Sequence, residues 1–134
     1  MTSPSTDGPG VGVLVVDEYP QIVAYLQATL GQRGHTVWAA GSGAEALALL
    51  REHRDEIDVA LLDVVMPGMD GPETLAALRA VEPALPCCFM TGNPGRYTAA
   101  DFLALGVACV FPKPLDVARI DAVLRELASC PPTD

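Results

Sequence analysis

Positive charge is scarce in this sequence, which contains a single lysine, Lys113. Eight lysines and arginines stand against 17 aspartates and glutamates, so the formal net charge at pH 7 is −9. Nucleic acids and anionic membrane surfaces are bound by clusters of lysine and arginine. The charge balance therefore predicts a protein that binds neither nucleic acid nor a membrane.

Long hydrophobic runs and metal-binding patterns of cysteine are also lacking. No apolar stretch approaches the roughly 18 residues that cross a bilayer, and residues 1–12 have neither the basic residue nor the apolar segment of a signal peptide. The four cysteines form no CxxC pair, and His35 and His53 are not spaced as joint ligands, which argues against structural zinc. We expect reduced cysteines in a cytoplasmic protein.

Apolar residues are abundant, although aromatic ones are few. Of the 134 residues, 50% are hydrophobic and only 5% are aromatic, which predicts one domain with an aliphatic core. Residues 1–10 consist mainly of Ser, Thr, Pro and Gly, and residues 130–134 are similarly poor in apolar side chains. We expect a disordered leader at 1–10, a folded block at 11–129 and a tail at 130–134.

Two hydrophobic periods alternate along the folded block. Short apolar runs at 11–16, 35–40, 59–62, 86–90 and 107–111 predict strands that are buried on both faces. Helical periodicity predicts one helix that begins at Pro20 and another that follows Ser42. Three more helices are predicted at residues 71–81, 98–105 and 115–127. This alternation predicts an α/β fold, a five-stranded parallel sheet with helices on both faces.

Two local signals predict how the first helices begin and end. Gly31 and Gly34 are candidate stops for the helix that begins at Pro20. Ser42, followed by Glu45 three residues later, predicts a capping box in which each side chain bonds the backbone N–H of the other residue.

Polar side chains follow four of the predicted strands. Asp17 and Glu18 follow the first, Asp63 the third, Thr91 the fourth and Lys113 the fifth. In an open parallel sheet, functional sites form at the carboxyl ends of the strands. Three carboxylates placed together repel one another unless a cation joins them, and oxygen ligands favour Mg²⁺. A metal, an ammonium group and a hydroxyl beside a carboxylate can receive a phosphoryl group.

Four segments carry a family resemblance: VLVVDE at 13–18, LLDVVMPGMDG at 61–71, MTG at 90–92 and FPKP at 111–114. In content, order and spacing they resemble the receiver domain of two-component response regulators, over residues 11–129. The resemblance implies a flavodoxin-like (βα)5 fold with strand order 2-1-3-4-5. It also implies a protein that is not an enzyme in its own right, beyond Mg²⁺-dependent self-phosphorylation and dephosphorylation.

The resemblance also implies roles for individual residues. Asp63 is the expected acceptor of a phosphoryl group from a phosphohistidine on a histidine kinase or histidine phosphotransfer protein. Phosphorylation is then expected to change the face formed by the fourth helix and fifth strand, and so the binding of a downstream protein. The expected Mg²⁺ ligands are Asp17, Glu18, Asp63 and the backbone carbonyl of Val65; the expected phosphoryl contacts are Thr91 and Lys113; the expected cis bond is Lys113–Pro114.

Two positions depart from the family pattern. Glu18 stands where the family commonly has aspartate as the second acid. Its side chain is longer by one methylene, which changes how its carboxylate reaches Mg²⁺. Val110 stands at the switch position, three residues before Lys113, where the family has an aromatic residue. Phe111 is adjacent, but alternation along a strand points its side chain to the other face.

Other functions stay open at this stage. A pseudo-receiver, which has the same fold but binds partners without phosphorylation, is supported by Glu18 and Val110. A phosphatase that forms an aspartyl phosphate would need an acid where Val65 stands, and flavin binding would need a phosphate loop after the first strand. Because few residues follow position 129, we expect the domain to act without an attached output domain.

Overall fold

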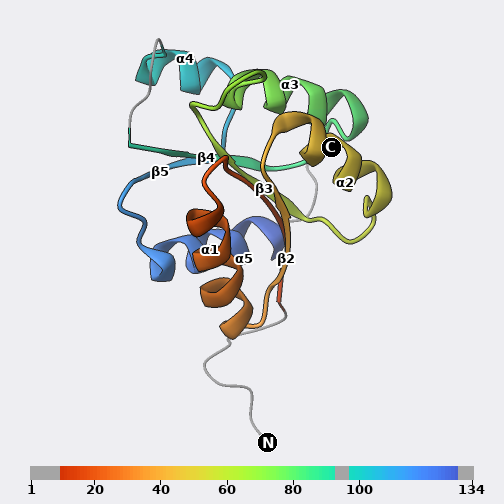
Figure 1. Cartoon of the computed structure of the whole chain (residues 1–134), viewed down its shortest axis with the longest axis vertical. Coiled ribbons are helices and arrows are strands. Elements are labelled where there is room, and N and C mark those ends of the chain that lie inside the picture. Colours follow the sequence, from red (N-terminus) through yellow and green to blue (C-terminus); the bar gives the residue numbers. More distant parts are fainter. Residues whose placement is uncertain (1–9, 93–96, 130–134) are drawn as a thin grey trace, which may run out of the picture.

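Five parallel strands form one sheet, and helices cover both of its faces (Figure 1). The computed structural model describes residues 10–92 and 97–129. Along the chain, its elements are β1 (Gly12–Val16), α1 (Pro20–Gln32), β2 (Thr36–Ala40), α2 (Gly43–Glu52), β3 (Val59–Asp63), α3 (Gly71–Val81), β4 (Cys87–Thr91), α4 (Ala99–Ala104), β5 (Cys109–Pro112) and α5 (Val117–Ser129). The strand order β2-β1-β3-β4-β5 confirms the expected fold.

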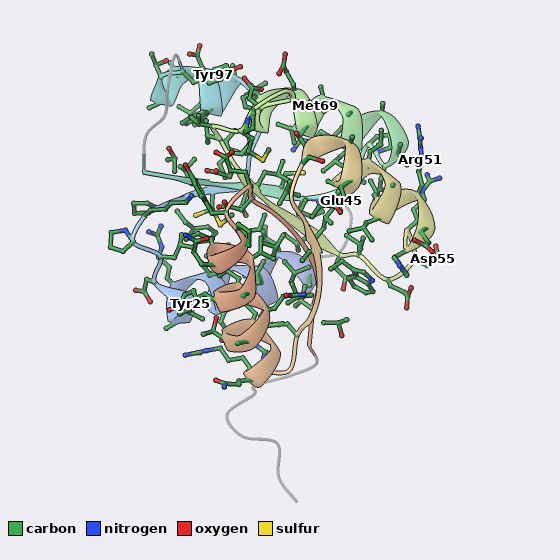
Figure 2. The ribbon with its side chains drawn as sticks, viewed as in Figure 1. Tyr25, Glu45, Arg51, Asp55, Met69 and Tyr97 are labelled. Carbon is green, nitrogen blue, oxygen red and sulfur yellow. The ribbon has the colours of Figure 1, made fainter. Side chains whose placement is uncertain are left out.

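The sheet separates two hydrophobic clusters. One joins alternate strand residues to α1 and α5, including Leu26, Leu30 and Ile120. The other joins the opposite strand face to α2, α3 and α4, including Leu50 and Leu78. Figure 2 shows side chains filling the space between the sheet and the helices on its two faces. β1 and β3 are buried along their whole length, which explains their uninterrupted apolar sequences.

Most differences from the predicted elements lie at their ends. β2 begins at Thr36 rather than His35, and β5 begins at Cys109 rather than at residue 107. α1 runs through Gly31 to Gln32; the chain instead turns at Gly34, whose φ of +96° is the left-handed conformation that glycine adopts readily. α5 begins at Val117, two residues later than predicted.

The capping box predicted at the start of α2 was wrong in one of its two hydrogen bonds. Ser42 Oγ accepts the backbone N–H of Glu45 at 3.2 Å, as expected. The Glu45 carboxylate, however, accepts the N–H of Gly41 and not that of Ser42. The backbone at Ser42 is nearly fully extended, with φ −157° and ψ 165°, and the Glu45 side chain bonds the amide one residue before it.

The predicted leader and tail cannot be compared with the structure in full, because residues 1–9 and 130–134 lie outside the described residues. Within 10–92 and 97–129, no helix is long and apolar enough to cross a membrane.

Candidate functional site

The carboxyl ends of four neighbouring strands bring Asp17, Asp63, Thr91 and Lys113 to one edge of the sheet. Asp63 ends β3, Thr91 ends β4, and Asp17 and Lys113 directly follow β1 and β5. The register places these ends level, because Asp63 is paired with Met90. Four of the predicted site residues are therefore neighbours, although 96 positions separate Asp17 from Lys113.

Lys113 joins the two aspartates. Its Nζ donates hydrogen bonds to Asp17 Oδ2 at 3.1 Å and to Asp63 Oδ1 at 3.3 Å. Asp17 is completely buried and Asp63 is only 5% exposed, whereas the lysine side chain is 21% exposed. Buried carboxylates are costly unless they are paired. The ammonium group therefore neutralises both acids from the solvent side.

The protonation equilibria of Asp63 and Lys113 reflect this packing. Burial raises the pKa of Asp63, the charge of Asp17 raises it further, and Lys113 opposes both effects. Burial alone would lower the pKa of Lys113, but hydrogen bonds and charges from Asp17 and Asp63 outweigh it and raise the pKa. Lys113 therefore stays an ammonium ion beside a carboxylate whose charge is destabilised by its surroundings.

Backbone hydrogen bonds fix the positions of both Asp17 and Lys113. Asp17 Oδ1 accepts the N–H of Tyr19 at 2.9 Å, which fixes the carboxylate at the start of α1. The Lys113 N–H donates to the Thr91 carbonyl at 3.0 Å, and the Lys113–Pro114 bond is cis, the form that the resemblance implies.

Gly71 allows α3 to begin against the backbone of Asp63. A Cβ atom on Gly71 would lie 2.6 Å from the Asp63 carbonyl oxygen and 2.8 Å from Val64 Cα. Real Cβ atoms do not approach that closely, so only glycine fits here without moving the strand end.

The Thr91 hydroxyl is the unsatisfied polar group of this site. Its Oγ1 is buried and has no hydrogen-bond partner within residues 10–92 and 97–129. A buried hydroxyl without a partner carries a free-energy cost of about 1–3 kcal/mol. The arrangement is therefore suited to an additional oxygen-rich group that reaches Thr91.

Glu18 is not gathered with the two aspartates, and the expected cluster of three carboxylates is not formed. Among the described residues, no group of three or more His, Cys, Asp or Glu side chains lies close enough to hold a metal ion. Successive residues of an extended chain point in opposite directions. Asp17 is buried, whereas Glu18 lies partly exposed at the rim.

The remaining donors nonetheless fit a hard cation. The buried carboxylates of Asp17 and Asp63 offer oxygen ligands, and their side-chain partners are the Tyr19 N–H and Lys113 Nζ. Mg²⁺ favours such oxygen ligands and keeps several waters, so it does not need a complete cage of protein side chains. Val65, two residues after Asp63, is 44% exposed.

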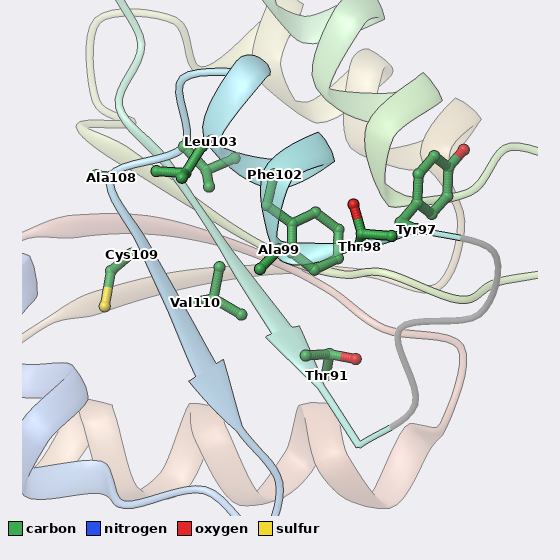
Figure 3. Close-up of a pocket in the computed structure, with 10 residues that line it drawn as sticks. Thr91, Tyr97, Thr98, Ala99, Phe102, Leu103, Ala108, Cys109 and Val110 are labelled. Carbon is green, nitrogen blue, oxygen red and sulfur yellow. The ribbon is translucent and has the colours of Figure 1, made fainter.

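A hollow of about 510 Å³ lies beside Val110, between α4 and β5 (Figure 3). Thr91 lies at one end of it and Phe102 and Leu103 border it from α4. Phe111 belongs to the opposite face of the sheet and is 2% exposed, which agrees with strand alternation. The short Val110 side chain therefore leaves open space next to the site hydroxyl.

Tyr97 is a residue of this region that the sequence analysis did not single out. It borders the hollow, and its hydroxyl donates to Asp70 Oδ2 at 2.7 Å. Asp70 caps α3, so this bond ties the start of α4 to the start of α3. A tyrosine ahead of a short helix carries no sequence signal for a bond to a residue 27 positions away.

Comparison with known proteins agrees with the geometry. The family model described as "Response regulator receiver domain" matches residues 13–125. The transcriptional regulatory protein ZraR of Escherichia coli (strain K12) is 37% identical over 116 residues, which make up 87% of this chain and 26% of ZraR. The chain thus spans about a quarter of the length of that relative.

Solved structures show the same fold. The chemotaxis protein CheY4 of Vibrio cholerae has a TM-score of 0.79 at 28% identity and covers 88% of this chain and 98% of its own. A CheX-CheY-BeF3-Mg²⁺ complex from Borrelia burgdorferi has a TM-score of 0.73 at 27% identity, over 84% of this chain and 85% of that chain. The chain belongs to the response regulator receiver domain family of two-component signalling systems.

Proposed function

We propose that Asp63 accepts a phosphoryl group from a phosphohistidine on a histidine kinase or histidine phosphotransfer protein. The observation that carries this proposal is the contact of Asp63 with Lys113 beside the buried, unpartnered hydroxyl of Thr91. A carboxylate nucleophile, a cation and a free hydroxyl in one place are the groups that an incoming phosphoryl group needs.

The transfer is a substitution at phosphorus. A carboxylate oxygen of Asp63 forms the new P–O bond while the P–N bond to the donor histidine breaks, and the histidine keeps that electron pair. Lys113 already contacts Asp63 Oδ1 and offers its remaining donors to the oxygens of the arriving group. The Thr91 hydroxyl donates its unused hydrogen bond to the same oxygens.

Mg²⁺ would be held by Asp17, Asp63 and the backbone carbonyl of Val65, with Glu18 at the rim. When bound, it supplies positive charge that neutralises the phosphoryl oxygens. The Mg²⁺ named in the Borrelia complex supports this assignment. Asp17 is completely buried and already bonded to Lys113, so a cation that binds it must share this carboxylate with the lysine.

Signal output is proposed to pass from Thr91 to α4 and β5. Thr91 borders the hollow that Val110 leaves open, so a rotation of its hydroxyl toward the phosphoryl group changes one end of that hollow. We propose that this change alters binding of a downstream protein to the face formed by α4 and β5. The protein would act in the cytoplasm, with no catalytic role beyond its own phosphorylation and dephosphorylation.

Acetyl phosphate supplies the test. With Mg²⁺ present, the intact mass should increase by one phosphoryl group, and neither Asp63→Asn nor the parent protein in excess chelator should show the increase. Asp55→Asn, which removes an exposed carboxylate far from the site in the α2–β3 connection, is the matched control and should be labelled like the parent. A parent protein that gains no phosphoryl group from acetyl phosphate, and whose spectrum does not change when beryllofluoride is added, would instead be a pseudo-receiver.

A further inference from the structure

Cys88 on β4 and Cys109 on β5 are paired in the register of the parallel sheet. Both side chains belong to the cluster on the α1 and α5 face, whereas Cys87 belongs to the cluster on the other face. Neighbouring strands are about 4.8 Å apart, and disulfides join Cα atoms about 4.4–6.8 Å apart. Of the three described cysteines, all free, only these two share both a register position and a face.

The two thiols differ in access to solvent. Cys88 is completely buried, while Cys109 is partly exposed on the outermost strand of the sheet. Burial raises the pKa of Cys88 to about 12, with smaller contributions from Cys109 and Cys87. A reagent in solution therefore meets Cys109 first.

A cationic side chain lies beside the Cys109 sulfur. Arg119 Nη2 lies 3.8 Å from Cys109 Sγ, and the same guanidinium lies 5.7 Å from the centre of the Phe111 ring. Figure 3 shows the Cys109 sulfur directed away from Val110 and the hollow. Exposed cysteines beside a basic side chain are the type that oxidants attack.

We infer that Cys109 is an oxidation site and that a hydroperoxide converts Cys88 and Cys109 into a reversible disulfide. The Cys109 sulfur attacks one peroxide oxygen; the O–O bond breaks, and the leaving oxygen takes up the thiol proton, which gives a sulfenic acid and water or an alcohol. The Cys88 sulfur then attacks the Cys109 sulfur. The S–O bond breaks, and hydroxide leaves with the Cys88 proton as water. Two thiols are oxidised and one peroxide is reduced.

This bond would join the two strands that end at the phosphoryl-accepting site. Cys88 lies three residues before Thr91, and Cys109 lies four residues before Lys113. Side chains that leave neighbouring strands in parallel start about one strand spacing apart, wider than the mean Cβ separation of ~3.8 Å in disulfides. Disulfides formed under such strain are reduced easily by thiols, so the modification is expected to be reversible.

The experiment treats the full chain with hydrogen peroxide, alkylates the remaining thiols, and maps peptides without reduction. The expected product is a pair of peptides linked through Cys88 and Cys109, two hydrogens lighter than the sum of the two peptides. It should be absent when the oxidised protein is treated with dithiothreitol before alkylation. Cys87→Ser and Cys130→Ser should form it as the parent does, whereas Cys109→Ser and Cys88→Ala should not. Arg119→Ala should slow the reaction at least about threefold, and Arg119→Lys less.

Two results would overturn the inference: Cys109 that stops at sulfenic or sulfinic acid, or a link that uses Cys87 or Cys130 instead of Cys88. Thermal unfolding of each variant checks that it is folded. If Cys88→Ala does not fold, alkylation of the parent decides, because Cys109 should react at least ten times faster than Cys88. The readout is a thiol mass change, so it does not depend on phosphorylation of Asp63.

Discussion

Lys113 lies nearer to Asp17, at 3.1 Å, than to Asp63, at 3.3 Å. The lysine therefore has a role in the resting fold, because Asp17 is completely buried and this ammonium group is its charged partner. The group proposed to receive the phosphoryl oxygens also holds together the acids that would otherwise repel one another.

Replacing Lys113 with alanine should destabilise the fold. The change leaves two buried carboxylates unpaired, which we expect to lower the free energy of unfolding by about 2 kcal/mol, less than for a fully enclosed pair because the lysine is partly exposed. Urea denaturation measures this loss. Added Mg²⁺ should restore more stability to the variant than to the parent protein, since a cation can replace the missing charge.

Arg51→Ala is the matched control for that experiment, because it removes a positive charge from an exposed position on α2. Its stability should stay within about 0.5 kcal/mol of the parent. Equal losses in the two variants would show that net charge, rather than the contact of Lys113 with Asp17, determines the effect.

Val110→Phe should be tolerated, because the larger ring can enter the hollow beside Phe102. The free energy of unfolding should change by less than about 1 kcal/mol, measured by urea denaturation. Leu62→Phe is the control, since Leu62 is completely buried in β3, and overpacking there should cost about 1–3 kcal/mol. A Val110→Phe protein as unstable as Leu62→Phe would mean that the hollow cannot admit a ring.

Replacing glycine with alanine should have opposite effects at Gly71 and at Gly31. Gly71→Ala would place a Cβ 2.6 Å from the Asp63 carbonyl oxygen, so it should destabilise the protein and reduce labelling by acetyl phosphate. Gly31→Ala meets no atom within 4 Å on α1 and should stabilise the helix by up to about 1 kcal/mol, with labelling unchanged. Thermal unfolding and intact mass distinguish the pair, and equal effects would contradict the close approach at Gly71.

The order and type of elements could be predicted from the sequence because each strand is an apolar run enclosed by helices. The residues at which the elements begin and end could not be predicted, since they depend on pairing between distant residues. The Ala108 N–H, for instance, bonds to the Cys87 carbonyl outside the regular strand β5. The capping boxes of α3 at Asp70 and of α4 at Thr98 did have local signals, an acid three residues later in each case.

The candidate site could be predicted where it depends on strand ends, and not where it depends on side-chain direction. Asp17, Asp63, Thr91 and Lys113 converge because parallel strands end at one edge. Glu18 was expected in the same cluster, but it is partly exposed, and among the described residues no three such acids lie close enough to hold a metal.

At the opposite end of the sheet, a buried histidine joins Asp121 on α5 to the start of β1. His35 Nδ1 accepts the Val11 N–H at 2.9 Å, so its Nε2 carries the proton and donates to Asp121 Oδ1 at 2.6 Å. Arg33 and Arg125 contact the same carboxylate at 3.3 and 3.0 Å. Burial would raise the pKa of Asp121, but the bonds from His35 and Arg125 outweigh it and lower the pKa below its ordinary value of 3.8.

The stability contributed by the Asp121 carboxylate should therefore depend on pH. A carboxylate with a lower pKa in the folded state stabilises the fold above its unfolded pKa, and this contribution is lost as pH falls through the folded value. Asp121→Asn keeps an acceptor for His35 but loses the charge, so it should cost about 1 kcal/mol at pH 7 and progressively less below pH 3.8. Urea denaturation across this range, with Asp55→Asn as the exposed control, measures the difference. A cost for Asp121→Asn that stays constant down to pH 2 would show that the neighbouring charges do not lower this pKa, since the carboxylate would then contribute no pH-dependent stability.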